Sequence, residues 1–276
     1  AYSIVVAYTI VRYRLMDITM VMRKGLTYGL LLGTITLPIY VGILISQRAT
    51  PYSIAPLLAC SLVFACGLWI FMKNHRSMSN ITFGLLCLGL STWLFGFFMV
   101  YSASTETEAQ FWGKLLYAGV VYIPAFFYHF CVSFLHAQPR SKLIAVNYAV
   151  STIFLLLIPT PYLIDGQHSY FWGYYPKAGP LHPVFLVFFF CVSVWSLLKL
   201  HAGYKARPAQ PELIRIKYVF WAFAIGYLSS LDFMQSYGIE LFPLGYLFVS
   251  LWAWIVSYAI AKYQLLDISF VLTKTK

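Results

Sequence analysis

Residues 81–101 read ITFGLLCLGLSTWLFGFFMVY, a run of 21 positions without a charged side chain. As a helix, a run of this length rises about 30 Å, which matches the hydrocarbon core of a bilayer. Within lipid, only a helix or a closed barrel satisfies its own backbone hydrogen bonds, and a barrel strand would alternate polar with apolar residues. Because the run shows no such alternation, it predicts a transmembrane helix.

The composition of the whole chain agrees with this interpretation. Of its 276 residues, 61% are hydrophobic and 10% are charged, whereas a soluble domain carries about 25% charged residues. There are too few polar side chains to cover the surface of a soluble protein of this size. The sequence therefore predicts a membrane protein and excludes a soluble globular domain.

Similar apolar runs recur along the chain, separated by short polar clusters. We predict an all-α fold, a polytopic transmembrane helical bundle with eight complete spans and one partial span at the N-terminus. Since the chain opens inside an apolar stretch and without a start methionine, we expect it to be a segment of a longer protein. The complete spans are 26–46, 54–72, 81–101, 111–135, 142–159, 183–203, 215–236 and 242–262, and the partial span is about 1–12.

The loops between the spans predict their orientation. Loops on one side of the membrane hold sixteen of the nineteen Lys and Arg residues, and those on the other side hold Arg48, Lys114 and Lys177. By the positive-inside rule the richer side is cytoplasmic, so we predict a multi-pass protein of the cell (inner) membrane with a cytoplasmic C-terminus. The basic residues form no stripe with interleaved aromatic residues, so no nucleic acid is expected as a partner despite the net charge of +11.

The longest external segment, about 160–182, is rich in aromatic residues, among them Tyr162, Phe171 and Trp172. Amphipathic rings favour the interface between membrane and water. The simpler interpretation is a loop that lies on the headgroups. The alternative is a lid over a ligand cavity formed by the ends of the helices.

Motifs of enzymatic or cofactor chemistry are missing from the sequence. It contains neither GxSxG nor HExxH, and the last span has no lysine before Lys262 that could bind retinal. We therefore expect no catalytic residue, no metal and no cofactor in this segment. The five cysteines lie within apolar runs without a metal-binding spacing, and we expect them to be small, buried apolar residues. They are Cys60, Cys66, Cys87, Cys131 and Cys191.

Few ionisable residues fall within or near the spans, and such residues invite a functional interpretation because they are costly in lipid. Asp232 lies near the outer end of one span and His129 in the cytoplasmic half of another. Together with Trp172 of the external segment, they are our candidate ligand-binding residues. Structural explanations stay open: Asp232 could pair with Lys114, and a neutral His129 could donate a hydrogen bond to a carbonyl.

Two prolines, Pro38 and Pro124, lie in the middle of predicted spans. Proline lacks the N–H that a helix needs and clashes with the preceding turn, so each predicts a kink. Such a kink could act as a hinge or open a pocket, and a purely architectural role is the simpler interpretation.

A repeat joins the two ends of the sequence. Tyr8–Val21 reads YTIVRYRLMDITMV and Tyr258–Val271 reads YAIAKYQLLDISFV, with seven of fourteen positions identical. Each copy fits a helix that leaves the cytoplasmic face, with a basic residue at the headgroups, a Tyr at the interface and a Leu-x-Asp-Ile turn in water. We therefore expect the end of one helical bundle, then a linking helix, then a second and complete bundle.

This division predicts four parts of the chain. One of them, the linking helix, carries three glycines on one face. Gly25, Gly29 and Gly33 are spaced by four residues, and such a face lets a neighbouring helix approach closely. The parts are the end of a bundle and its exit motif at 1–24, the linking helix at 25–50, a seven-helix sensor domain at 51–264 and an exit segment at 265–276.

Several stretches, taken in order, resemble the seven-helix membrane region at the N-terminus of bacterial histidine kinases. In this resemblance the spans from 54–72 to 242–262 are helices one to seven. It implies a sensory input region that feeds a cytoplasmic output, often the kinase of a two-component system. No phosphoacceptor or nucleotide-binding part lies in the sequence, so a cyclase or phosphatase output would fit equally well. The stretches are RYRLMDI (12–18), RKGLTYGLL (23–31), FWGKLLYAGVVYIPAFFYHF (111–130), GPLHPVF (179–185) and LDFMQSYGIELFPLGY (231–246).

The resulting hypothesis is a membrane sensor that passes a ligand or membrane signal through its last helix. Its expected partners are the lipid bilayer, an unknown small ligand and a signalling module in the same chain, and a homodimer is left open. Two alternatives remain: a small-molecule transporter or channel, which would need polar groups at mid-membrane, and a structural membrane domain without a ligand. The expected signal-coupling residues are Tyr263, Leu265, Asp267 and Ile268.

Overall fold

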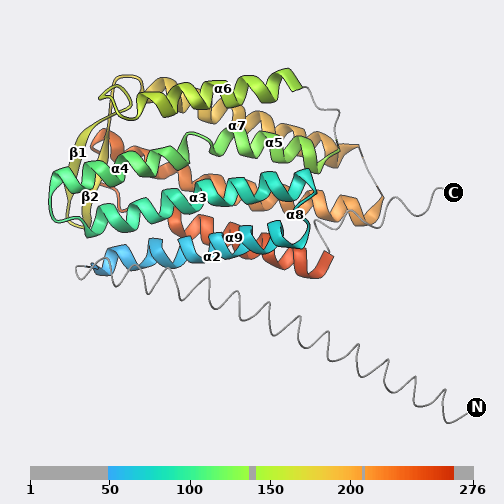
Figure 1. Cartoon of the computed structure of the whole chain (residues 1–276). Coiled ribbons are helices and arrows are strands. Elements are labelled where there is room, and N and C mark those ends of the chain that lie inside the picture. The colour runs from blue at the N-terminus through green and yellow to red at the C-terminus, as the bar shows by residue number, and fades with distance from the viewer. Residues whose placement is uncertain (1–48, 137–140, 207–208, 264–276) are drawn as a thin grey trace, which may run out of the picture.

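The computed structural model describes residues 49–136, 141–206 and 209–263. The partial span 1–12 and the linking span 26–46 lie outside these residues, so their predictions are not tested. The described residues form a bundle of helices that lie side by side, with a short β-hairpin at one end (Figure 1).

The helices follow the predicted spans closely. Four helical stretches in the described part of the chain are long and apolar enough to cross a membrane: Pro51–Lys73, Met78–Ser102, Glu106–Phe134 and His182–Lys205. The helical membrane bundle is thus confirmed, whereas the number of eight complete spans stays a prediction. The helices are α2 (Pro51–Lys73), α3 (Met78–Ser102), α4 (Glu106–Val120), α5 (Ile123–Phe134), α6 (Ser141–Leu157), α7 (His182–Lys205), α8 (Gln210–Gly226), the 3-10 helix η1 (Tyr227–Tyr237) and α9 (Gly245–Tyr263).

Helix α3 lies in the interior of the bundle and α7 at its periphery. The most apolar window of α3 is 72% buried, against 28% for that of α7. Helix α3 packs on α2, α4 and α5, while α9 packs on α2 and α8. Between residues 183 and 198 the exposed residues of α7 are all apolar, as for Val187 and Leu198, which is the pattern of a helix that faces lipid.

Two predicted spans are each divided into two helical pieces. Span 111–135 becomes α4 and α5, because Pro124 has no N–H to donate to the carbonyl of Val120 and its ring clashes with that turn. The kink predicted at Pro124 is therefore confirmed, and Pro38 lies outside the described residues. Span 215–236 becomes α8 and η1, because the chain changes from an α-helix to a tighter 3-10 helix at Tyr227. A long 3-10 segment is uncommon and marks a place of function or strain.

The external segment folds as an antiparallel hairpin of β1 (Ile164–Tyr170) and β2 (Gly173–Ala178). The all-α prediction was therefore incomplete for this segment. Tyr170 stands opposite Gly173, which has φ +131°, and a Cβ added to Gly173 would lie 3.0 Å from the Cα of Tyr101. Only glycine fits this approach without strain, so the hairpin sits directly on the end of α3.

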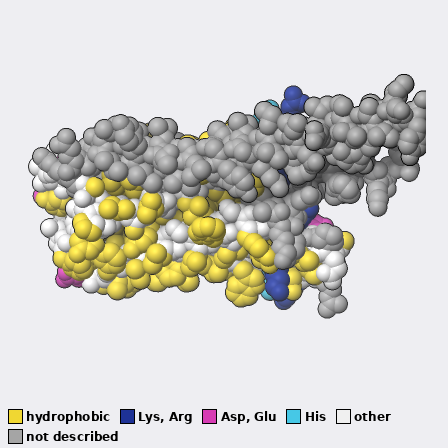
Figure 2. Space-filling view, turned by 90° about the horizontal axis from the view of Figure 1, so that it is seen from below, with side chains coloured by type: hydrophobic (Ala, Val, Ile, Leu, Met, Phe, Trp, Pro, Cys, Tyr) yellow, Lys and Arg dark blue, Asp and Glu magenta, His cyan; other side chains and the backbone are white. Residues whose placement is uncertain are grey.

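The surface of the bundle is largely apolar. In Figure 2 hydrophobic side chains cover the described part of the visible face, and Lys and Arg gather toward the end away from the hairpin. Of the five cysteines, Cys60, Cys66, Cys87 and Cys131 are buried as predicted. The prediction was wrong for Cys191, which is exposed because it lies on the outer face of α7.

Candidate functional site

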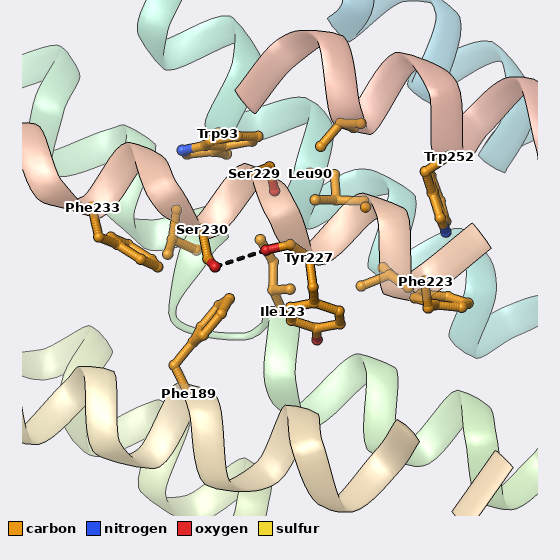
Figure 3. Close-up of a pocket in the computed structure, with 14 residues that line it drawn as sticks. Leu90, Trp93, Ile123, Phe189, Phe223, Tyr227, Ser229, Ser230, Phe233 and Trp252 are labelled. Carbon is orange, nitrogen blue, oxygen red and sulfur yellow. Dashed lines mark hydrogen bonds between the residues drawn. The ribbon is translucent and has the colours of Figure 1, made fainter. Parts of the chain in front are cut away.

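A cavity of about 50 Å³ lies between α3, α4, α5, α7, α8, η1 and α9. Figure 3 shows the side chains that surround it, mostly aromatic rings pointing inward from several helices. The residues labelled there are Leu90, Trp93, Ile123, Phe189, Phe223, Tyr227, Ser229, Ser230, Phe233 and Trp252.

Both helix breaks contribute to the walls of this cavity. Ile123 is the first residue of α5, just after the proline-induced break, and lines one side. Gly226 and Tyr227, at the junction of α8 and η1, line another side. The hydroxyl of Ser230 donates to the carbonyl of Tyr227 at 2.7 Å, which satisfies a backbone group where the helix type changes. The two irregular places in the helices therefore meet at one internal space.

The lining of the cavity is uncharged. Its polar side-chain groups belong to Ser229, Ser230 and Tyr227 and to the indoles Trp93 and Trp252, and the rest of the wall is hydrocarbon or aromatic. Phe223 and Trp252 are held by further ring contacts, with centroids 5.5 Å apart. Such a wall suits an uncharged and largely apolar molecule, because a charged one would lose its hydration without a compensating partner.

A smaller space of about 20 Å³ lies beside this cavity, toward the hairpin. The two spaces share Trp93, Ser229 and Phe233 in their walls. Tyr175 and Pro176 of β2 also line the smaller space. The hairpin thus forms part of the wall of this smaller space.

Asp232 lies in the wall of the smaller space and holds the beginning of α9. Its carboxylate accepts hydrogen bonds from the N–H of Leu244 at 3.1 Å and from the N–H of Gly245 at 3.0 and 2.9 Å. A carboxylate is favoured there by the free N–H groups and the positive end of the helix dipole. Gly245 is required for this contact, since a Cβ at that position would collide with the Asp232 carboxylate.

The hairpin is also bonded to η1. The hydroxyl of Tyr175 donates to the carbonyl of Asp232, and that of Tyr170 donates to the carbonyl of Gln235 at 2.8 Å. Burial, and then the charge of Asp232, hold the pKa of the Tyr175 phenol well above its ordinary range. Tyr175 therefore keeps its proton and stays a hydrogen-bond donor.

His182 forms a second connection at the hairpin end of the bundle, one that the sequence analysis missed. The side chain is fully buried at the start of α7, with Nε2 2.7 Å from the Tyr117 hydroxyl and Nδ1 2.8 Å from the Tyr237 hydroxyl. It therefore joins α4, α7 and η1. The one signal in the sequence was a histidine beside a helix-starting proline, Pro183, and that pattern does not reveal its partners.

The three predicted ligand-binding residues do not meet in one site. Asp232 lines the smaller space, as described above. Trp172 is buried in the hairpin, stacked on Tyr170 with ring centroids 4.6 Å apart, and is not among the residues that line either space. His129 is half-buried on α5, where its Nδ1 pairs with the Tyr148 hydroxyl of α6 at 3.1 Å.

The suggested structural partners also differ from the prediction. The suggested pairing of Lys114 with Asp232 was wrong, since Lys114 Nζ donates to the carbonyl of Pro159 at 2.9 Å. His129 bonds a hydroxyl instead of the expected carbonyl. Of the expected signal-coupling residues, Tyr263 ends the described part of α9. Leu265, Asp267 and Ile268 lie outside the described residues.

Comparison with known proteins identifies the region. No curated protein matches the chain. A family model described as the N-terminal 7TM region of histidine kinase matches residues 55–269, which run from the first turns of α2 to beyond α9. The match covers all the helices that surround the cavity and confirms the resemblance noted in the sequence. The chain therefore belongs to the family of N-terminal seven-transmembrane regions of histidine kinases.

Proposed function

We propose that this membrane sensory input domain binds a small, uncharged and largely apolar molecule in the cavity at η1 and transmits its presence through α9. Family membership supports the sensory role. The observation that carries the proposal is a continuous connection: η1 lines the cavity, and Asp232 of η1 bonds the first N–H groups of α9. A change at the cavity wall is thereby connected to the last helix.

The aromatic wall of the cavity supplies the coupling. A molecule that enters the cavity presses on rings such as Phe233 and Tyr227, which line it. Both rings belong to η1, whose short 3-10 turns hold it less firmly than an α-helix would. The ligand therefore favours a packing in which η1 has moved, and its differential affinity for the two packings sets how far the equilibrium shifts.

The output leaves the bundle at the end of α9. In this proposal Tyr263, Leu265, Asp267 and Ile268 carry the displacement of α9 into a signalling module in the same chain, on the cytoplasmic side. The positive-inside pattern supports this orientation. A histidine kinase is the module that family membership favours.

The test is a reporter kinase fused after Lys276, measured in membranes. Val249 is buried in the cavity wall, and Val249→Phe fills the space much as a ligand would. Val187, 64% exposed on α7, provides the matched control Val187→Phe. Overpacking destabilises the packing of helices that has the smaller cavity by about 1–3 kcal/mol. Val249→Phe should therefore change the basal kinase output at least about fivefold, and the control should leave it unchanged.

A second pair of variants tests the route of the signal. Asp232→Ala removes the bonds to α9, and Asp267→Ala alters the exit segment. Each should abolish the change in output that Val249→Phe causes. If Val249→Phe folds and gives wild-type output, the cavity does not control the kinase, and a structural role without a ligand is the better account. If Asp267→Ala leaves signalling unchanged, the exit segment is not the coupling element.

A further inference from the structure

An apolar groove of about 220 Å³ lies on the outside of the bundle, between α2 and α3. Its walls are Phe64, Leu68 and Phe71 on α2 and Ile81, Leu85 and Leu88 on α3. On each helix these residues recur at intervals of three and four, so each set forms one face. The residues of α3 that line the internal cavity, such as Leu86 and Leu90, lie on the other side of that helix, and the two sites are separate.

Glycines form the floor of the groove. Gly67 and Gly84 both line it, and a Cβ added to Gly84 would lie 3.7 Å from the carbonyl oxygen of Gly67. The two backbones therefore come close together at this depth. Phe64, Phe71 and Leu88 at the rim are 36%, 42% and 51% exposed. An opening with a glycine floor and aromatic rims can accept another helix at short range.

We propose that the linking segment 26–46 of this same chain docks as a helix in this groove. The segment has the length of a membrane span, about 30 Å as a helix, and it is joined to α2 by residues 47–50 alone. Spans joined by so short a connection are antiparallel neighbours. The segment therefore returns along α2, and the groove is on the side of α2 that the rest of the described bundle leaves open.

The depth of the groove matches the glycine-rich part of the linking segment. In an antiparallel pair with Ser46 opposite Pro51, the same number of residues is counted along each helix from this point. Gly33 then lies opposite Phe64, and Leu26 lies opposite Phe71. The groove residues of α2 are thus level with residues 26–33, where Gly29 and Gly33 lie. Small residues on the entering helix and small residues on the floor together permit the closest approach of the backbones. Leu26 and Leu30 flank the glycine face and are placed to fill the space beside it.

The experiment is photo-crosslinking of the whole chain in membranes. A benzophenone amino acid replaces Phe64 or Leu88 at the rim, and in a control protein it replaces Leu198, which is 55% exposed on α7. After irradiation, the crosslinked peptides are identified by mass spectrometry. From both rim positions we expect a crosslink to residues 25–33 of the same chain. We expect no such crosslink from the control position or from an unirradiated sample.

A matched pair of substitutions tests the glycine face. Gly29→Leu should lower the crosslinking yield from Phe64 at least about fivefold, because overpacking of a close helix contact is unfavourable. Thr27→Leu, two positions away and so on the opposite face, should leave the yield unchanged. The proposal is overturned if the rim positions crosslink only to lipid or to a second copy of the chain. It is also overturned if both substitutions reduce the yield equally while the proteins elute as the wild type does.

Discussion

At the scale of single residues, Asp232 is a buried polar group with defined partners. It is 6% exposed, and its carboxylate accepts three hydrogen-bond contacts from two N–H groups at the start of α9. A buried carboxylate is tolerated only with such partners. From the sequence, Asp232 was interpreted as a residue near the membrane surface. The sequence did not reveal that it caps α9 through the N–H group of Leu244, which lies 12 residues further along the chain.

Asp232→Ala should therefore lower the stability of the bundle. Each hydrogen bond to a charged group is worth about 1.5–3 kcal/mol, so the loss is expected to be about 3 kcal/mol. Thermal unfolding in detergent measures it. The control is Glu240→Ala, which removes an exposed carboxylate from the same end of the bundle and should leave the unfolding temperature unchanged. Equal unfolding temperatures for the two variants would contradict the capping role.

His182 permits a second prediction at this scale. Removal of the ring by His182→Ala leaves a cavity and takes one hydrogen-bond partner from each of the hydroxyls of Tyr117 and Tyr237. Tyr117 keeps its contact with the hydroxyl of Ser236. We expect a loss of about 3 kcal/mol in the free energy of unfolding, against about 1 kcal/mol for Tyr237→Phe, which removes one hydrogen bond. His75→Ala, at an exposed position, is the control. A loss from His182→Ala no greater than that of the control would refute the role of this connection.

At the scale of elements, the breaks in the helices and the hairpin matter more than the regular helices. The regular helices supply apolar surface, whereas the α4–α5 break and the α8–η1 junction open an internal space. The hairpin lines the smaller neighbouring space through Tyr175 and Pro176. Its position depends on Gly173, which combines a positive φ with a close approach to the backbone of α3.

Two glycine variants compare an open turn position with one that is both crowded and further from the left-handed helical region. Gly166 and Gly173 both have positive φ, but a Cβ on Gly166 would find its nearest neighbour at 3.8 Å, against 3.0 Å for Gly173. We expect Gly166→Ala to cost about 1 kcal/mol from conformation alone. Gly173→Ala should cost at least about twice as much, because the hairpin must also move away from α3. Thermal unfolding of both proteins gives the comparison, and equal losses would show that the contact with α3 is unimportant.

At the scale of the whole molecule, the bundle has two unlike ends. One end carries the hairpin and its aromatic side chains, and the other carries most of the described Lys and Arg residues (Figures 1 and 2). This polarity is what the count of basic loops predicted. It supports an outer hairpin and an inner exit, as a domain that reports to a cytoplasmic kinase requires.

Cysteine labelling in intact cells checks this orientation. In a Cys191→Ala background, Tyr162→Cys in the hairpin region should react with a membrane-impermeant maleimide, because the side chain at that position is 53% exposed. His75→Cys, exposed in the loop between α2 and α3, should react only after the membrane is opened. The reverse pattern would show that the bundle is inserted the other way, and the proposed output path would then be wrong.

Hydropathy, loop charge and the ordered stretches of family resemblance were enough to predict the helical membrane bundle, its family and the kink at Pro124. They succeed because lipid forces each span to satisfy its own backbone hydrogen bonds, which makes a span a local property of the chain. The cavity, the Asp232 cap on α9, the His182 connection and the hairpin were decided by the tertiary structure. Apolar helix faces look alike in sequence, so the partners of Asp232 and His182 depend on how distant helices pack, and no local pattern encodes that.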